Sequence, residues 1–347
     1  MMLFGGTGDL VTRKLLPALY RRHAAGQVSN DSRIFGIART SLTRDQYLQS
    51  AKDSCVEFLG KDFDEAHWSA FSAQLFYLTI DANVTEHYAA LASALRGREQ
   101  QVRVFFFSTA STLFAPICAQ LAKADLITPA SRVVLEKPLG HDLASADEIN
   151  QSIASVFRER QIYRIDHYLG KEAVQNLLAL RFANAIFEPL WNANAIEQVQ
   201  ISVAETVGVG GRWGFYDSTG ALRDMVQSHV LQLLCLVAME PPAGFTPSAV
   251  RNEKVKVLWS LRPITAENVA THTVRGQYAN GFAGGEAAPG YLEETGAAKG
   301  SDTETFVAIK VEVDNWRWAG VPFYLRTGKA LCTKRTEIAI KFKQAPF

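Results

Sequence analysis

The run Asp166-His167-Tyr168-Leu169-Gly170-Lys171 places an acid, an imidazole, a phenol and an ammonium group within six positions. If a helix begins near Tyr168, His167 and Lys171 lie four residues apart and therefore on one face. They would then offer a compact set of cationic donors to a dianion such as a phosphate ester, which leaves Asp166 for another task. A solvated helix start with Asp166 as its N-cap explains any one of these residues, but not all of them together.

A second group of candidate residues lies in a helical pattern over residues 220–239, where Asp224 and His229 stand among apolar residues. Five residues correspond to about 140° around an α-helix, so these two cannot form an acid–base pair within the helix. If His229 is a base, its orienting carboxylate must come from elsewhere. The alternative is that His229 is a satisfied core histidine.

A glycine turn stands near the start of the chain, because residues 1–4 read as a buried strand that runs into Gly5, Gly6, Thr7, Gly8, Asp9 and Leu10 before a helical pattern. Glycines let the backbone approach a pyrophosphate closely, and a helix N-terminus supplies N–H groups and positive potential. Val11 occupies the place of the third glycine of the full dinucleotide motif. A plain tight turn therefore stays an alternative.

The residue after the second predicted strand, residues 33–38, bears on the choice of cofactor. Dinucleotide-binding enzymes that use NAD place an acid near this point, on the ribose hydroxyls. Here the residue is Arg39, whose guanidinium matches a 2′-phosphate in charge and in bidentate geometry. The sequence therefore favours NADP, with NAD as a secondary cofactor.

The first half of the chain continues to alternate between strands and helices. Apolar strands at residues 75–78, 102–107 and 132–135 are separated by helical patterns at 84–96 and 113–122. This order predicts an α/β, Rossmann-like domain with a doubly wound parallel sheet. Ligands bind at the carboxyl ends of such strands, where Ser108-Thr109 and Glu136-Lys137-Pro138 fall. An ordinary exposed turn is the alternative for the second segment.

We place the domain boundary at Asp166, which predicts an NADP-binding domain at 1–165 and a substrate-binding domain at 166–347. The second domain is expected to be α+β with a largely antiparallel sheet. Its predicted elements are a strand at 196–204, a helix at 250–261, further strands at 271–278, 306–313, 322–326 and 338–342, and a long surface loop at 281–300.

Composition excludes several classes of protein. The net charge is +1 and no five like charges follow one another, which argues against a nucleic-acid partner. No apolar stretch is long enough to cross a membrane, and the start of the chain has no signal pattern, so we expect a cytoplasmic protein. The four cysteines are widely spaced, which argues against a zinc site or a disulfide framework and predicts reduced, buried thiols.

The run from Arg164 to Glu172 resembles the substrate-binding signature of the glucose-6-phosphate dehydrogenase family, and the resemblance extends from Gly5 to Lys329. It implies oxidation of glucose 6-phosphate at C1 to 6-phosphogluconolactone with hydride transfer to NADP, the first step of the oxidative pentose phosphate pathway. It also implies that His229 is the general base and that Asp166 orients it. No metal is required, since the cofactor supplies the redox chemistry.

The resemblance implies further roles for residues that would otherwise pass for solvated charges, such as Glu205 at a strand end and Lys14 in the first helix. Ser111 stands where family members usually carry a proline, which would relax its loop. The implied substrate-binding residues are His167, Tyr168, Lys171, Glu205, Asp224, Lys329, Lys334 and Lys137. The implied cofactor-binding residues are Gly5, Gly6, Thr7, Gly8, Asp9, Leu10, Lys14, Arg39 and Lys137.

Family members continue beyond the point that corresponds to Phe347. The resemblance therefore implies a C-terminally truncated chain, either a fragment or a shortened gene product. The missing part would hold further strands and much of the interface of a homodimer or higher oligomer, and we expect the last strand to present an unprotected edge. Two other functions fit parts of the sequence. One is a non-phosphorylated sugar oxidoreductase of the glucose–fructose oxidoreductase type, and the other is a catalytically inactive NADP-binding regulator.

Overall fold

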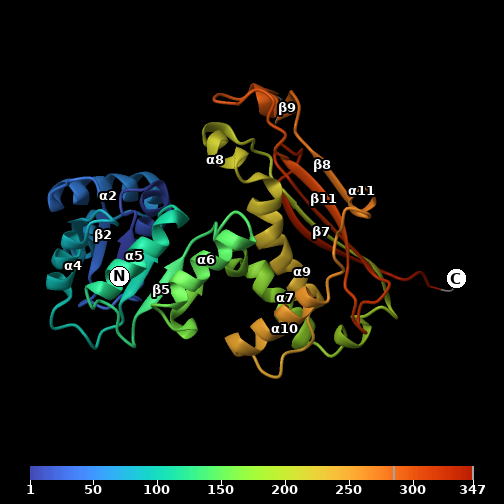
Figure 1. Ribbon diagram of the computed structural model, residues 1–347, viewed down its shortest axis with the longest axis horizontal. Helices are drawn as coiled ribbons and strands as arrows, with labels where there is room; N and C mark the ends of the chain where they lie inside the picture. The colour runs from blue at the N-terminus through green and yellow to red at the C-terminus, as the bar shows by residue number, and fades with distance from the viewer. Residues whose placement is uncertain (284–285, 346–347) are drawn as a thin grey trace. The chain divides into compact units, whose positions relative to one another are not determined.

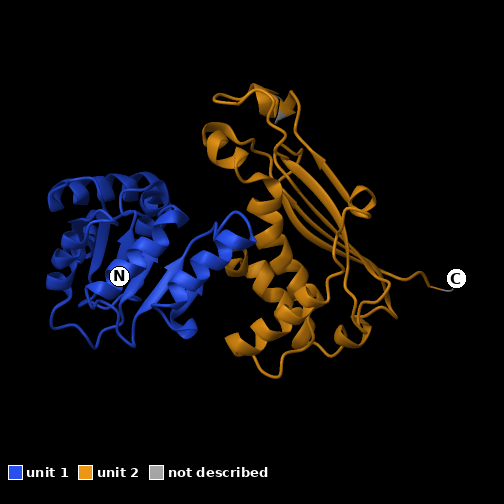
Figure 2. Cartoon of the chain, viewed as in Figure 1, with its two compact units in different colours: residues 1–165 blue, residues 166–347 orange. Residues whose placement is uncertain are grey.

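The computed structural model describes residues 1–283 and 286–345. Residues 284–285 of the predicted loop and residues 346–347 at the predicted truncated end lie outside the described residues. The chain forms two compact units, Met1–Ile165 and Asp166–Phe347 (Figure 2). Each unit has its own hydrophobic core.

The first unit is built on a six-stranded sheet in the order β3-β2-β1-β4-β5-β6, with every neighbouring pair parallel. This is the strand order of the doubly wound dinucleotide fold, so the predicted Rossmann-like class is confirmed. The strands are β1 Met2–Phe4, β2 Ile34–Ala38, β3 Leu75–Thr79, β4 Val104–Phe107, β5 Arg132–Leu135 and β6 Ile162–Arg164.

Both faces of this sheet are covered because side chains alternate along each strand. Met2 and Phe4 pack on one face with α4 Tyr88–Leu95, α5 Phe114–Lys123 and α6 Leu143–Ala154. Leu3 packs on the other with α1 Leu16–Ala24, α2 Arg44–Leu59 and α3 Glu65–Ala73. Shorter turns are η1 Val11–Leu15, which is π-helical, and the 3-10 turns η2 Gly60–Asp62, η3 Thr85–His87, η4 Ser111–Leu113 and η5 Glu159–Gln161.

Helices α2, α3 and α6 were not among the predicted elements. In α2 the buried residues are Tyr47, Ala51, Cys55 and Leu59. These residues stand at every fourth position and form a stripe only one residue wide, so the helical periodicity of apolar residues in the α2 sequence is weak. The helix starts on a capping box in which the Thr43 side chain accepts from the backbone N–H of Gln46, a signal read from two residues and easily missed.

The second unit holds a five-stranded sheet in the order β13-β7-β12-β11-β8. Three of its four pairings are antiparallel, which confirms the predicted largely antiparallel sheet, while β7 and β12 run parallel. Among the described residues β13 pairs only with β7, so the last strand forms an edge as predicted. The strands are β7 Ile196–Ala204, β8 Thr273–Gly276, β11 Phe306–Glu312, β12 Pro322–Gly328 and β13 Arg335–Phe342.

Helices α7 Glu172–Phe182, α9 Leu231–Ala238 and α10 Pro247–Trp259 lie against one face of this sheet (Figure 1). Their apolar side chains form a single core with those of β7, β11 and β12. Apart from two short strands described below, the remaining elements of the unit are η6 His167–Gly170, η7 Glu188–Leu190, η8 Gly210–Arg212, α8 Trp213–Asp217, the π-helical η9 Leu222–Val230, α11 Val269–His272 and η10 Tyr291–Glu293.

The predicted surface loop at 281–300 is partly wrong. Strands β9 Gly281–Ala283 and β10 Glu286–Ala288 pair antiparallel within it. The loop was predicted because the segment is rich in glycine and alanine. Such short strands are held by hydrogen bonds between backbones, which amino-acid composition does not reveal.

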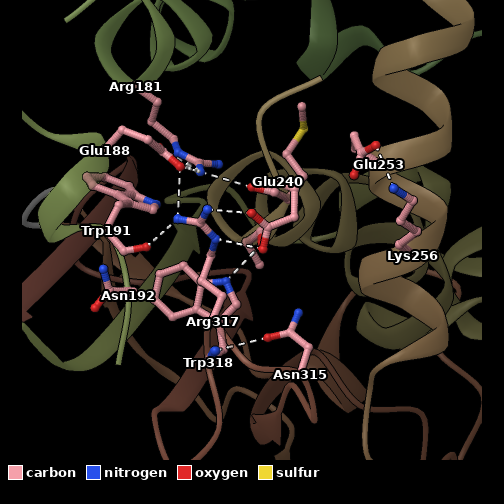
Figure 3. A network of polar contacts seen from close by, with 12 residues as sticks. Arg181, Glu188, Trp191, Asn192, Glu240, Glu253, Lys256, Asn315, Arg317 and Trp318 are labelled. Atoms are coloured by element: carbon pink, nitrogen blue, oxygen red, sulfur yellow. Dashed lines mark hydrogen bonds and ion pairs between the residues drawn. The ribbon is translucent and has the colours of Figure 1, made fainter. Parts of the chain in front are cut away.

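A buried ion network ties the second unit together (Figure 3). Arg181 of α7 is fully buried, and it donates to the carbonyl oxygens of Leu236 and Met239 at 2.9 Å and pairs with Glu188 at 3.1 Å. Arg317 pairs with Glu188 at 2.8 Å and also with Glu240. Burial lowers the pKa of Arg181 to about 10, against the opposing charge of Glu188. The network therefore links α7, the end of α9 and the β11–β12 connection.

The four cysteines are free. Cys55, Cys118 and Cys235 are buried as predicted, and burial raises the pKa of each thiol. Cys332 is exposed, so the prediction is wrong at that position. It lies in the turn between β12 and β13, where the chain returns along the surface.

In the described part of the chain, no helix is long and apolar enough to be a candidate membrane span. The longest α-helix in the described residues, α2, has 16 residues, whereas a bilayer crossing needs about 20 apolar ones.

Candidate active site

Asp166 and His229 are in direct contact. Asp166 precedes the 3-10 turn η6 and caps it, since its Oδ1 accepts from the backbone N–H of Tyr168 at 2.9 Å. The same oxygen lies 2.6 Å from Nδ1 of His229, which is fully buried on η9. A carboxylate from one segment thus reaches an imidazole on another, 63 residues further along the chain.

The pKa of Asp166 lies below its usual value. Burial of the carboxyl opposes ionisation, but the hydrogen bond and charge of His229, the Tyr168 N–H and the charge of His167 outweigh it. An ionised carboxylate only accepts hydrogen bonds, so the proton between the two groups is carried on Nδ1 of His229. That tautomer makes Nε2 the basic nitrogen of the ring.

The α-helix start near Tyr168, on which the placement of His167 and Lys171 on one face depends, is not found. Residues 167–170 form a 3-10 turn, and Lys171 is the extended N-cap residue of α7. His167 and Lys171 are therefore not stacked on one α-helical face. They meet instead around Tyr168, because Lys171 Nζ lies 3.2 Å from the centre of that ring and the His167 ring lies 4.9 Å away.

Several cationic side chains gather at Tyr168. Desolvation and the nearby charge of Lys334 lower the pKa of Lys171. The His167 ring lies 4.4 Å from the His229 ring. Cations held close together against their mutual repulsion would be stabilised by a dianion. The group could therefore bind a phosphate ester beside His229.

The hydroxyl of Tyr168 is hydrogen-bonded to Thr336 of β13, a residue outside the predicted set. Thr336 lies two positions after Lys334, which stands directly before β13, so one segment of the chain supplies both. Only the strand order, which places β13 beside β7, brings this pair to Tyr168.

The angle around the helix axis between Asp224 and His229 is smaller than α-helical geometry predicts. The segment η9 is π-helical, with hydrogen bonds between residues five apart, so these two residues lie one turn apart. The expected separation of about 140° is therefore wrong, because it assumed an α-helix.

The His229 ring stacks on the Tyr168 ring, with 4.3 Å between the ring centres. Burial raises the pKa of Tyr168, and the charges of Glu205, Asp166 and Asp224 raise it further.

Glu205 and Lys329 form an ion pair of 2.6 Å, in which Lys329 is 5% exposed. Each follows the end of a strand, and the two strands are the parallel pair β7 and β12, in which Ala204 lies opposite Gly328. Parallel strands end at the same edge, so the residues after them meet. The Glu205 N–H also donates to the Gly328 carbonyl at 3.0 Å.

Asp166, His167 and His229 each offer a ligand atom within 4.8 Å of the others, a spacing that could admit a metal ion. The 2.6 Å between Asp166 Oδ1 and His229 Nδ1 is shorter than the roughly 3.3 Å expected between two ligands of a tetrahedral zinc ion. Those two atoms are therefore arranged as a proton-sharing pair.

In the first unit the glycine turn packs tightly against two strand ends. Gly5 has φ +83°, and a Cβ there would lie 2.2 Å from the Ser108 carbonyl oxygen. A Cβ on Gly6 would lie 2.6 Å from the Ile37 nitrogen. The Gly8 N–H donates to the Gly5 carbonyl at 2.8 Å. Thr7 and Asp9 are exposed and Leu10 leads into η1. This side-chain-free backbone fits a pyrophosphate.

Other predicted cofactor residues of this unit follow strand ends on the same sheet. Arg39 is exposed just after β2, and Lys137 is half-buried just after β5, in a cis Lys137–Pro138 bond. Thr109, after β4, has a buried hydroxyl without a hydrogen-bond partner in the described part of the chain. Lys14 is exposed on η1, and Ser111 begins η4.

Two family models together match nearly the whole chain. The model for "Glucose-6-phosphate dehydrogenase, NAD binding domain" matches residues 2–176, and that for "Glucose-6-phosphate dehydrogenase, C-terminal domain" matches residues 178–347. The chain belongs to the glucose-6-phosphate dehydrogenase family. Its first unit is accordingly the domain that binds a nicotinamide dinucleotide.

Relatives in this family are similar over the full chain. The glucose-6-phosphate 1-dehydrogenase of Rhizobium meliloti is 53% identical over 346 residues, which is 99% of this chain and 70% of that protein. The enzyme of Zymomonas mobilis is 52% identical over 100% of this chain and 71% of its own length. The crystal structure of the Mycobacterium avium enzyme is 40% identical, with a TM-score of 0.89 over 100% of this chain and 73% of that chain.

A solved glucose-6-phosphate dehydrogenase in complex with glucose 6-phosphate is 35% identical and has a TM-score of 0.90, covering 100% of this chain and 72% of that one. The family thus accounts for both units of the fold.

Proposed function

We propose that this chain oxidises glucose 6-phosphate at C1 to 6-phosphogluconolactone and reduces NADP, with His229 as the general base. Membership of the family makes the chain an oxidoreductase of this sugar phosphate. The observation that carries the assignment of the base is the 2.6 Å contact between His229 Nδ1 and Asp166 Oδ1, beside a cluster of cationic side chains.

His229 takes the proton of the C1 hydroxyl on Nε2. Asp166 holds the Nδ1–H tautomer, and its negative charge stabilises the imidazolium that forms. The buried position of His229 keeps this geometry in place.

The remaining side chains of the site hold the sugar phosphate. His167, Lys171 and Lys334 bind the phosphate together with Tyr168, and this remote binding energy orients C1 toward His229. Glu205 and Asp224 accept hydrogen bonds from sugar hydroxyls, and Lys329 donates to them. The ion pair of Glu205 with Lys329 holds acceptor and donor side by side.

The dinucleotide is bound by the glycine turn of Gly5, Gly6 and Gly8, where Thr7, Asp9 and Leu10 complete the cradle. Arg39 selects NADP through the 2′-phosphate, and NAD is a weaker alternative without that contact. When bound, the nicotinamide accepts the hydride released from C1. Lys14 and Lys137 complete the set.

The test is the ultraviolet absorbance of the reduced nicotinamide, with glucose 6-phosphate as substrate and NADP or NAD as cofactor. We expect NADP to be preferred and Arg39→Asp to reverse the preference. His229→Asn is expected to lower kcat about 10²- to 10⁴-fold. Equal rates with glucose would favour a non-phosphorylated sugar oxidoreductase. Calorimetric binding of NADP without turnover, unchanged by His229→Asn, would favour a regulator.

Two further expectations complete the proposal: a homodimer or higher oligomer of the full-length form, which the family resemblance implies, and a cytoplasmic location, which the sequence favours. Light scattering on purified chain measures the oligomeric state. A stable monomer with full activity would remove the oligomer from the proposal and leave the chemistry intact.

A further inference from the structure

Tyr216 in α8 carries a buried hydroxyl that has no hydrogen-bond partner among the described residues. The side chain is only 3% exposed. Its aromatic neighbours use their polar groups: the Tyr291 hydroxyl donates to Asp217 at 2.8 Å, and the Trp213 indole donates to the Tyr291 carbonyl at 3.1 Å. A buried polar group left unpaired within a well-paired cluster requires an explanation.

The Tyr216 ring lies beside residues already assigned to the sugar. Nζ of Lys329 is 5.2 Å from its centre, and that ammonium group pairs with Glu205. Desolvation and then the charge of Asp224, with Glu304, Tyr291 and Glu205, raise the pKa of the Tyr216 phenol well above its usual value. The phenol therefore keeps its proton as a donor next to two carboxylates.

The backbone that follows Tyr216 is held in place by Glu304. The link from α8 to η9 passes through Gly220, at φ +69°, where a Cβ would lie 2.6 Å from the Glu304 carboxylate. Glu304 accepts from the Leu222 N–H with its side chain at 2.8 Å and from the Ala221 N–H with its carbonyl at 3.0 Å. The Tyr216 side chain precedes this anchored link and is itself buried, so it loses little freedom when a ligand arrives.

We propose that Tyr216 binds the sugar, with its hydroxyl hydrogen-bonded to one of the non-reacting hydroxyls held by Glu205, Asp224 and Lys329. The carboxylates only accept and the ammonium only donates, whereas a phenol does both, as a sugar hydroxyl does. Tyr216 would thus complete a network in which each hydroxyl has a donor and an acceptor. This inference rests on the proposed function.

The test replaces Tyr216 by Phe, which removes the hydroxyl and keeps the ring. We expect kcat/KM for glucose 6-phosphate to fall about 5- to 30-fold, mostly through KM. The melting temperature without substrate should stay the same or rise, because the Tyr216 hydroxyl has no hydrogen bond to lose within the described part of the chain. Tyr291→Phe is the matched control: it loses the bond to Asp217, so it should melt earlier while kcat/KM stays within about twofold.

Deoxy analogues of glucose 6-phosphate, lacking the hydroxyl at C2, C3 or C4, identify the contact. Wild type should discriminate against each analogue, and Tyr216→Phe should lose that discrimination at one position only. If Tyr216→Phe keeps the wild-type discrimination at every position, the inference is overturned while the proposed function stands. If wild type neither binds nor oxidises glucose 6-phosphate, the proposed function fails, and this inference with it.

Discussion

Oδ1 of Asp166 serves two purposes. It accepts from the Tyr168 N–H, which starts the turn η6, and it holds Nδ1 of His229. The first bond fixes where the carboxylate sits and the second fixes the tautomer of the imidazole. A residue whose local role is to cap a turn is thereby pre-positioned for its role in the site.

Asp166→Asn should keep the turn, because its amide oxygen still accepts, but it cannot stabilise an imidazolium by charge. We expect kcat to fall about 10²- to 10⁴-fold at neutral pH, as judged by nicotinamide absorbance. Asp302→Asn, at an exposed position, is the matched control and should change nothing. Wild-type turnover by Asp166→Asn would remove Asp166 from the mechanism.

The pKa of Asp166 also predicts a pH dependence of stability. Its folded value is lowered, so its ionised form stabilises the fold above the unfolded value of about 3.9. That contribution is lost as pH falls through the lower folded value. Denaturant unfolding should therefore show the difference between wild type and Asp166→Asn shrinking below about pH 4. A difference that grows in acid would contradict this sign.

Element geometry decides which residues face one another. The π-helical η9 sets Asp224 and His229 one turn apart, and the parallel pair β7 and β12 brings Glu205 to Lys329. Neither contact depends on the side chains alone. The first depends on the π-helical hydrogen bonds of η9, and the second on the parallel backbone pairing of β7 with β12.

The glycine turn predicts a difference between two alanine substitutions at positive φ. Gly26→Ala, at φ +67° in open space, should cost only the left-handed backbone strain, about 1–2 kcal/mol. Gly5→Ala adds a contact of 2.2 Å with the Ser108 carbonyl, so it should cost more than about 3 kcal/mol and weaken NADP binding. Guanidinium unfolding measures both losses. Equal losses would show that the turn relaxes.

The ion network predicts a large effect at Glu188. Its carboxylate forms ion pairs with both Arg181, which is fully buried, and Arg317 (Figure 3). Glu188→Gln should destabilise the second unit by about 2–4 kcal/mol, because the buried guanidinium loses its counter-charge. The control Lys256→Gln breaks a pair with Glu253 in which the lysine is 62% exposed, so it should cost about 0.5 kcal/mol or less. Urea unfolding measures the loss of unfolding free energy in each variant, and equal losses in Glu188→Gln and Lys256→Gln would refute the prediction.

At the scale of the whole molecule, the two units have separate cores and separate sets of proposed ligand contacts. Ligands stabilise the unit they bind, by about 2.7 kcal/mol at 100-fold excess over Kd. Hydrogen exchange should therefore show NADP protecting the β1 and β2 amides, and glucose 6-phosphate protecting η9 and the ends of β7 and β12. Glucose is the control and should protect little. Protection by either ligand confined to the other unit would contradict these assignments.

Much of the fold follows from local pattern. The glycine turn, the strand periods and the strand–helix alternation of residues 1–165 predict a doubly wound sheet, because each is a short-range consequence of side-chain spacing and backbone freedom. The strand at 196–204 is likewise visible in its alternation. Local pattern did not show where the helix after Asp166 begins: the extended backbone of Lys171 ends the 3-10 turn, and α7 starts at Glu172 instead of near Tyr168.

The sequence by itself determined which chemical groups are present and which short segments carry them: the run at Asp166, the glycine turn and Arg39. Only the tertiary structure decided which groups meet. The contact of Asp166 with His229, the pairing of Glu205 with Lys329, and the positions of Thr336 and Tyr216 join segments far apart in the chain. Such contacts depend on strand order and on the pitch of one helix, which are set by packing of the whole unit rather than by neighbours in the chain.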